Sequence, residues 1–341
     1  MDEKQKKRLL WQVPFLTLLI IGTVLIIRQQ HNMPYQRYSD FVFGTTFTVT
    51  YQCDSDMSQS IKAELMKVDY SLSPFNKESV ITAINNNEDV KPDKMFMDVF
   101  QLAMDVSRET DGAFDITVAP LVNAWGFGFK SGEKPTARQV DSLRQIIGYQ
   151  KITVDHGKIR KQDPRMMLDC SAIAKGYGTD VVANFLRQRG VKNFMVEIGG
   201  EVVTCGVNPE RVPWKVGVIK PEDDSLSVSH ELQTILNVTD IAMATSGNYR
   251  NFYYQGGKKY AHTIDPKTGY PVQHNILSAT VLAKTCALAD AYATSFMVMG
   301  LDKAQKVLEQ HPELMVYFIY DDGQGKNAVW FSPSLKDKIA N

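Results

Sequence analysis

The chain has 341 residues, of which 44% are hydrophobic, so it is long enough to bury the core of one large domain or of two lobes. Lysine plus arginine and aspartate plus glutamate both number 38, and this balance argues against nucleic acid as a partner, because nucleic-acid binding usually needs a basic surplus. The 4 cysteines show no CxxC or zinc-finger spacing, which disfavours a zinc site and a dense disulfide framework.

The N-terminal segment has the pattern of a membrane anchor. A basic flank over 1–8 precedes an uncharged run over 9–27, which is just long enough to span a hydrocarbon core. The positive charge of this flank predicts that residues 1–8 stay in the cytoplasm and that everything after Arg28 is exported to the periplasmic side of the inner membrane. A cleaved signal peptide is the alternative, but no A-x-A-type site follows the run. The polar residues 28–39, which include Pro34, predict a short tether.

The residues over 40–341 are predicted to form one domain, as a single body or as two lobes around a central cleft. Alternating β-branched and aromatic residues over 41–52 predict a strand interrupted at Gly44. Further strands are predicted over 152–159 (a hairpin), 194–198, 202–207, 214–219, 232–238, 241–245, 252–264 (a hairpin), 276–283, 315–320 and 328–331. Helices are predicted over 57–69, 92–110, 137–147 after a capping Thr136, from near 171 to 190, from 286 and over 301–308. Strands in adjacent runs and after helices indicate an α+β fold, with mixed or antiparallel sheets and packed helices, preceded by the transmembrane helix.

The segment 111–128, DGAFDITVAPLVNAWGFG, is too rich in glycine, proline and aromatic residues to be regular throughout. Such a loop can present Trp125 and Phe127 for stacking on a flat ring, because aromatic faces supply a large apolar area. The alternative is a loop that only fills a core.

The segment 168–178, LDCSAIAKGYG, precedes a helix with apolar periodicity. A helix that begins near Ser171 would bring free N–H groups, the positive end of the helix dipole and Lys175 together, which suits phosphate. Lys175 as an ordinary surface lysine is the alternative. No GxxxxGK[ST] or GxGxxG motif is present, so a Walker A loop and a Rossmann unit are excluded.

His262 falls at the end of a predicted strand, where a titratable group can meet a pocket. A purely structural histidine is the alternative.

The segment 286–295, CALADAYATS, predicts the start of a helix that carries Asp290 and Thr294 on one face. Alternate alanines around them predict open space for a ligand or an ion. Two oxygen donors suit Mg²⁺ or Ca²⁺ better than Zn²⁺. A close-packed helix with a solvated or paired aspartate is the alternative.

A series of segments in one order resembles the ApbE family of FAD:protein FMN transferases, from about Tyr38 to about Leu301. These segments are FGTTFTV at 43–49, DGAFDITVAPLVNAWGFG at 111–128, LDCSAIAKGYG at 168–178, VEIGGE at 196–201, ATSGNYR at 244–250, HTIDPKTGYP at 262–271 and ALADAYATS at 287–295. The resemblance implies a Mg²⁺-dependent enzyme that cleaves the pyrophosphate of its substrate FAD, releases AMP and joins the FMN phosphate to a threonine hydroxyl. The implied partner is an exported or membrane flavoprotein subunit that carries the acceptor threonine.

The resemblance also implies the residues of the site. The metal would be held by Asp290, Thr294 and the backbone carbonyl of Ala172. Contacts with FAD are implied at Phe43, Phe75, Ala124, Trp125, Gly126, Asp169, Lys175 and Ile264. Phe43 stands where methionine is common in the family. Phe75 stands where tyrosine is common, so it lacks the hydroxyl of that tyrosine. Ala293 lacks a carboxylate that some members carry beside the threonine, and no lipobox is present.

A threonine hydroxyl is a poor nucleophile near neutral pH and needs a nearby base. His262 is the candidate catalytic base, and Asp290 is its competitor. Besides transfer, two other functions fit these residues: hydrolysis of FAD to FMN and AMP at the same site, and non-catalytic FAD binding or delivery. An intact set of Ala172, Asp290 and Thr294 favours the two enzymes over the carrier.

Overall fold

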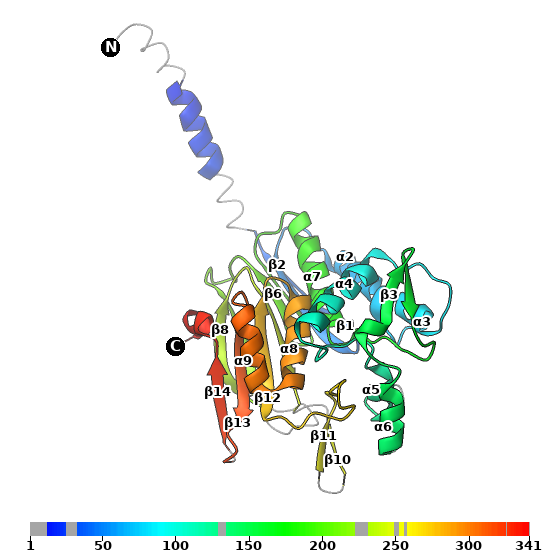
Figure 1. Ribbon diagram of the computed structural model, residues 1–341. Helices are drawn as coiled ribbons and strands as arrows, with labels where there is room; N and C mark the ends of the chain where they lie inside the picture. Colours follow the sequence, from blue (N-terminus) through cyan, green and yellow to red (C-terminus); the bar gives the residue numbers. More distant parts are fainter. Residues whose placement is uncertain are drawn as a thin grey trace.

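An antiparallel sheet of eight strands, in the order β1-β2-β5-β6-β9-β12-β13-β14, forms the centre of the described chain (Figure 1). The computed structural model of the protein describes residues 12–24, 33–128, 134–221, 231–248, 252–255, 258–324 and 326–340. The strands of this sheet are β1 (Tyr35–Val42), β2 (Thr45–Gln52), β5 (Phe194–Ile198), β6 (Glu201–Cys205), β9 (Ala242–Gly247), β12 (Ile276–Ala283), β13 (Met315–Asp321) and β14 (Asn327–Phe331). Every neighbouring pair in it is antiparallel, which confirms the predicted α+β class.

Three antiparallel hairpins lie outside this sheet. They are β3 (Ile152–Asp155) with β4 (Lys158–Lys161), β7 (Trp214–Ile219) with β8 (Leu232–Val238), and β10 (Phe252–Gln255) with β11 (Lys258–Ala261). All of them fall on strands that the sequence predicts.

From residue 33 onward, the helices among the described residues are α2 (Ser58–Leu72), α3 (Val80–Asn85), α4 (Lys94–Glu109), α5 (Ala119–Ala124), α6 (Ala137–Arg144), α7 (Ala174–Gln188), α8 (Cys286–Met299) and α9 (Leu301–Gln310), with 3₁₀ turns at Tyr149–Lys151 and Pro333–Lys338. The capping prediction at Thr136 is confirmed, because its hydroxyl accepts the Gln139 N–H and the Gln139 side chain reaches back to the Thr136 N–H. Six residues of the predicted loop 111–128 form the helix α5 instead.

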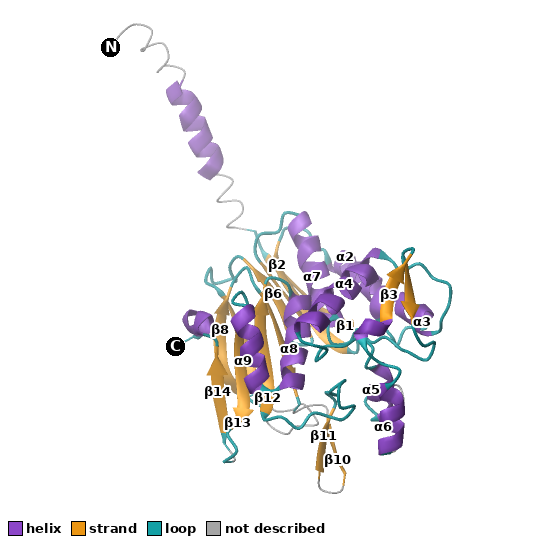
Figure 2. Cartoon of the chain, viewed as in Figure 1, coloured by secondary structure: helices purple, strands orange, loops and turns teal. Residues whose placement is uncertain are grey.

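The sheet is covered on both faces, with α8 and α9 over one of them (Figure 2). Side chains alternate along β12, since Val281 packs with α4 and α8, whereas Leu282 packs in a cluster with β7 and β8. A further cluster joins β2 and β5 to α2 and α7. This layering places α7 and α8 next to each other beside the sheet.

The N-terminal part of the domain differs from the prediction. Strand β1 begins at Tyr35, inside the predicted tether over 28–39, and pairs with β2. Phe43 and Gly44 form the turn between them with φ angles of 52° and 74°, and two-residue hairpin turns of type I′ need positive φ at both positions. The predicted interruption at Gly44 is therefore the turn of a hairpin, and the strand before it begins earlier than predicted.

The described part of the predicted membrane anchor is a helix over 12–24, and the two ends of the predicted run 9–27 lie outside the described residues. Within the described ranges, no helix combines the length and the apolar character needed to cross a bilayer.

Candidate functional site

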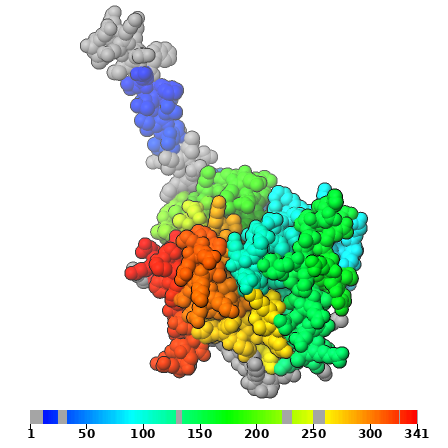
Figure 3. Space-filling view, viewed as in Figure 1, coloured from blue at the N-terminus to red at the C-terminus, as the bar shows by residue number. Residues whose placement is uncertain are grey.

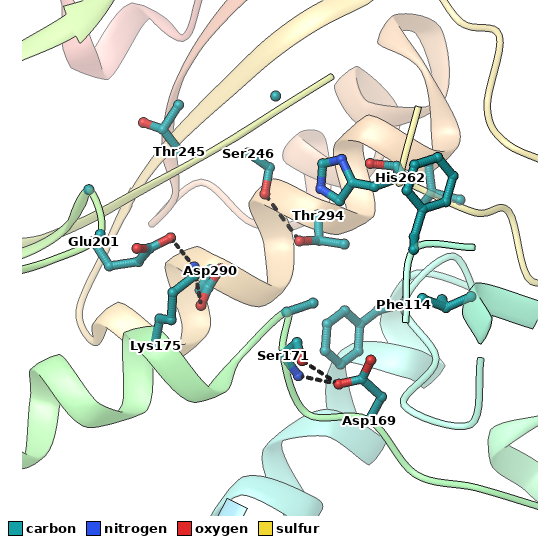
Figure 4. Close-up of a pocket in the computed structure, with 18 of the residues that line it drawn as sticks. Phe114, Asp169, Ser171, Lys175, Glu201, Thr245, Ser246, His262, Asp290 and Thr294 are labelled. Atoms are coloured by element: carbon teal, nitrogen blue, oxygen red, sulfur yellow. Dashed lines mark hydrogen bonds and ion pairs between the residues drawn. The ribbon is translucent and has the colours of Figure 1, made fainter. Parts of the chain in front are cut away.

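A cavity of about 830 Å³ lies where the start of α7, the middle of α8 and the turn between β5 and β6 meet (Figure 4). Its wall comes from segments that are far apart in the sequence, within residues 74–75, 113–128, 168–175, 195–202, 215–219, 243–247, 262–266 and 290–298, and from Leu232. This volume is typical of cavities that bind small molecules or cofactors.

Asp290 and Thr294 project from α8 into this cavity, as their spacing predicts. One oxygen of Asp290 accepts the Gly176 N–H at 3.1 Å, across 114 residues of sequence. The Thr294 hydroxyl lies 3.1 Å from the Ser246 hydroxyl on β9. Burial raises the pKa of Asp290, while the charge of Lys175 and the Gly176 N–H oppose that rise.

The turn before α7 brings Ala172 to the cavity. The Asp169 carboxylate accepts the N–H and the hydroxyl of Ser171 at 2.8 and 2.5 Å, and this turn delays the start of the helix to Ala174. The prediction of a helix from near Ser171 is therefore wrong by one turn, and Lys175 lies in the first turn of α7. Asp169, Ala172 and Lys175 all line the cavity.

Lys175 is part of a charged cluster rather than an ordinary surface lysine. Its Nζ lies 2.5 Å from Oε1 of Glu201 and 3.9 Å from Oδ2 of Asp290 (Figure 4). Burial acts against the ammonium charge, but Asp290 and Glu201 outweigh it and hold the pKa of Lys175 above its ordinary value. Burial raises the pKa of Glu201 to about 7, with Lys175 opposing the rise. The cluster thus combines two carboxyl groups with one ammonium group.

Close packing of α7 on α8 builds this cluster. A Cβ on Gly176 would come within 2.4 Å of the Cys286 carbonyl oxygen, so only glycine permits the approach. Asp180 then accepts the N–H groups of Cys286 and Ala287, both at 2.9 Å, and so caps the start of α8. The alanines of α8 at positions 287, 289, 291 and 293 are themselves buried by packing, while Asp290 and Thr294 beside them line the cavity, as predicted. Small side chains serve here to bring two helices together.

His262 follows directly after β11 and lines the cavity. Its ring meets the Phe127 ring edge-on, with the ring centroids 6.5 Å apart. In Figure 4, His262 and Thr294 lie toward one end of the cavity, whereas Lys175 and Glu201 lie toward the other. A ligand between these ends would contact both groups.

Most of the predicted site residues meet at this one cavity. Those that line it are Phe75, Asp169, Ala172, Lys175, His262, Ile264, Asp290 and Thr294. Those that do not line it are Phe43, Ala124, Trp125 and Gly126.

The predicted stacking role of Trp125 is wrong. Its side chain is 1% exposed and packs with Leu121, Tyr260 and Ile264, and its Nε1 donates to the Gly269 carbonyl at 2.8 Å. Trp125 therefore fills a small core, which is the alternative stated for the segment 111–128. In Figure 3, the segment after β11, in yellow, lies between the orange α9 and the green α5–α6 segment.

Phe43 is also turned away from the cavity. Its ring packs against α7 so closely that a Cβ on Gly178 would come within 2.6 Å of it. The neighbours Ala124 and Gly126 at the end of α5 flank Trp125 and contribute nothing to the cavity wall.

Sequence reasoning missed three residues that shape the site: Ser246, Glu201 and Asp180. Ser246 looked like part of a turn, and Glu201 like the residue after a Gly-Gly turn. Asp180 is an acidic residue among the apolar positions of α7. Because charged side chains are rarely buried without a partner, an acidic residue at such a position is a sequence signal that its carboxylate binds a buried polar group.

The cavity residues fit a divalent cation that prefers oxygen. The predicted donors are all oxygen atoms, one of them a backbone carbonyl. Within the described ranges, no group of three or more His, Cys, Asp or Glu side chains is arranged to hold a metal ion. Glu201 Oε2 is buried and has no hydrogen-bond partner. When its ammonium group and both carboxyl groups are ionised, the cluster carries a surplus negative charge that a cation would balance, and a bound cation would favour that ionised form.

Comparison with known proteins finds relatives of one family. Residues 43–318 match the ApbE family. The FAD:protein FMN transferase of Vibrio cholerae is 36% identical over 326 residues, which are 92% of this chain and 95% of that protein. The protein of the same name from Haemophilus influenzae is 38% identical over 299 residues, or 83% and 85% of the two chains. The structure of the flavin transferase ApbE from Vibrio cholerae aligns with a TM-score of 0.81 at 34% identity, over 90% of this chain and 99% of that one.

Proposed function

The chain belongs to the ApbE family, and from this premise we propose that it transfers the FMN moiety of FAD to a threonine hydroxyl of another protein and releases AMP. One observation carries the proposal: Ala172, Asp290 and Thr294 meet at a single cavity together with Lys175 and His262. A carrier that only bound FAD would not need metal-binding oxygen atoms, the Lys175 ammonium group and the His262 base in one cavity.

The metal of the proposed reaction is Mg²⁺, held by the Asp290 carboxylate, the Thr294 hydroxyl and the Ala172 carbonyl. When bound, it would neutralise charge on the pyrophosphate oxygens. Lys175, in the first turn of α7, would hold phosphate by its charge, together with the positive end of the helix dipole. Phe75, which is 68% exposed at the cavity wall, offers an apolar face to a ring of the dinucleotide.

The chemical step exchanges one P–O bond for another. The acceptor hydroxyl oxygen forms a bond to the phosphorus of the FMN half, the bond from that phosphorus to the bridging oxygen breaks, and AMP leaves with the electron pair. The hydroxyl proton passes to the His262 imidazole. Asp290, the competing base, is already engaged by the Gly176 N–H.

An acceptor assay tests transfer against hydrolysis. We expect incubation of the full-length chain with FAD, Mg²⁺ and an exported flavoprotein subunit that carries an acceptor threonine to add the mass of FMN to that subunit. Mass spectrometry of the subunit and chromatography of the free nucleotides measure both products. Free FMN with an unmodified subunit would mean that the protein is a pyrophosphatase, and unchanged FAD would leave only the carrier function.

We also propose that the segment 9–27 anchors the chain in the inner membrane, with the catalytic domain on the periplasmic side. The basic flank and the uncharged run support this. Protease added to intact spheroplasts should then digest the domain, and its survival until the cells are lysed would contradict the proposal.

A further inference from the structure

Glu201 is a buried carboxylate that the reaction above does not use. It begins β6 directly after Gly199 and Gly200, whose φ angles of 59° and 100° turn the chain from β5 into β6. The residue is 2% exposed and lines the cavity. One of its oxygens accepts a hydrogen bond from Lys175, and the other is buried without a partner. An unsatisfied buried oxygen costs free energy, so its retention calls for a functional reason.

The distances within the cluster indicate that reason. Lys175 Nζ lies within hydrogen-bond range of Glu201, at 2.5 Å, but 3.9 Å from Asp290, which is beyond that range. Charges attract each other more strongly in a buried site than in water. Without Glu201, the nearest carboxylate for the ammonium group would be Asp290. A direct pair between Lys175 and Asp290 would be neutral and would weaken the attraction of the Asp290 carboxylate for a cation.

We propose that Glu201 is a positioning residue that holds the Lys175 ammonium away from Asp290, so that Asp290 keeps its charge and its free oxygen for a divalent cation. This inference rests on the proposed function, because it concerns the same Mg²⁺ site. With all three side chains ionised, their formal charge is one negative unit, whereas Lys175 and Asp290 alone would have none.

Direct Mg²⁺ binding tests the inference without reference to activity. Mg²⁺ alone is titrated into the full-length protein by isothermal calorimetry, and the same samples are unfolded by heat with and without Mg²⁺. We expect Glu201→Gln to raise the Kd for Mg²⁺ about tenfold or more, which corresponds to about 1.4 kcal/mol. Glu201→Asp, which keeps the charge, should recover most of the affinity.

The decisive variant combines Glu201→Gln with Lys175→Met. Removing the ammonium group leaves Asp290 unpaired, so this double variant should bind Mg²⁺ more tightly than Glu201→Gln alone. Glu197→Gln is the matched control, because Glu197 lines the same cavity from β5 and its charge interacts with Arg37. The control should change the Kd by less than about threefold.

The outcomes separate this inference from the proposed function. A Glu201→Gln protein with the Kd of the wild type, or a double variant no better than Glu201→Gln, would overturn the inference. If the wild type still flavinylates its acceptor in the presence of Mg²⁺, the proposed function survives that result. A wild type that binds no Mg²⁺ would overturn both the metal assignment and the role of Glu201.

Discussion

Replacing Asp290 with asparagine is expected to lower the rate of FMN transfer by at least about a thousandfold and to abolish its response to Mg²⁺. A metal ion supplies several kcal/mol of transition-state stabilisation, and about 4 kcal/mol corresponds to this factor. Asparagine keeps the shape of the side chain and an acceptor for the Gly176 N–H, but it carries no charge to hold the cation. The measurement is the initial rate of acceptor flavinylation across a series of Mg²⁺ concentrations, with FAD binding followed separately.

Asp302→Asn is the matched control, since it removes an exposed carboxylate from the first turn of the neighbouring helix α9. It should leave the rate and the Mg²⁺ response unchanged. Both variants must unfold at nearly the temperature of the wild type for the comparison to hold. An Asp290→Asn protein that transferred FMN at the normal rate in Mg²⁺ would disprove the metal assignment.

Replacing His262 with glutamine is expected to lower kcat by about a hundredfold to ten-thousandfold, the usual contribution of a general base. Binding of FAD should persist, because the charged groups that would hold its phosphates lie toward the other end of the cavity (Figure 4). The measurement is single-turnover transfer at saturating FAD, Mg²⁺ and acceptor, which isolates the chemical step from binding.

His156→Asn is the control for this variant. The His156 side chain is 91% exposed in the β3–β4 hairpin, and asparagine tolerates its φ of 47°. Its rate should match that of the wild type. Normal single-turnover transfer by His262→Gln would remove this histidine from the reaction and leave Asp290 as the remaining candidate base.

The aromatic positions show where a sequence motif stops being informative. Trp125 and Phe75 both look suited to stack on a ring, yet Trp125 is 1% exposed and Phe75 is 68% exposed. The difference arises because the segment after β11 packs over Trp125 and accepts its Nε1 hydrogen bond through Gly269, 144 residues away. No local pattern around Trp125 contains that contact.

The alanines of α8 illustrate the same limit. Their small size is visible in the sequence, but it equally allows an open ligand site or close helix packing. The structure shows both, because Gly176 of α7 approaches the Cys286 carbonyl closely while Asp290 and Thr294 line the cavity. The charged cluster exists as a result of that packing, since Lys175 and Asp290 lie on the two helices that it joins.

The sequence by itself determined the α+β class, most helices and strands, the cap at Thr136 and the pairing of Asp290 with Thr294 on one helix face. These features depend on periodicity, capping and turn chemistry, which act between residues close together in the chain. Only the tertiary structure decided that Glu201 holds Lys175, that Asp180 caps α8 and that Trp125 is buried. Those contacts join residues 26, 106 and 144 positions apart, and such distant pairs are set by how the elements pack.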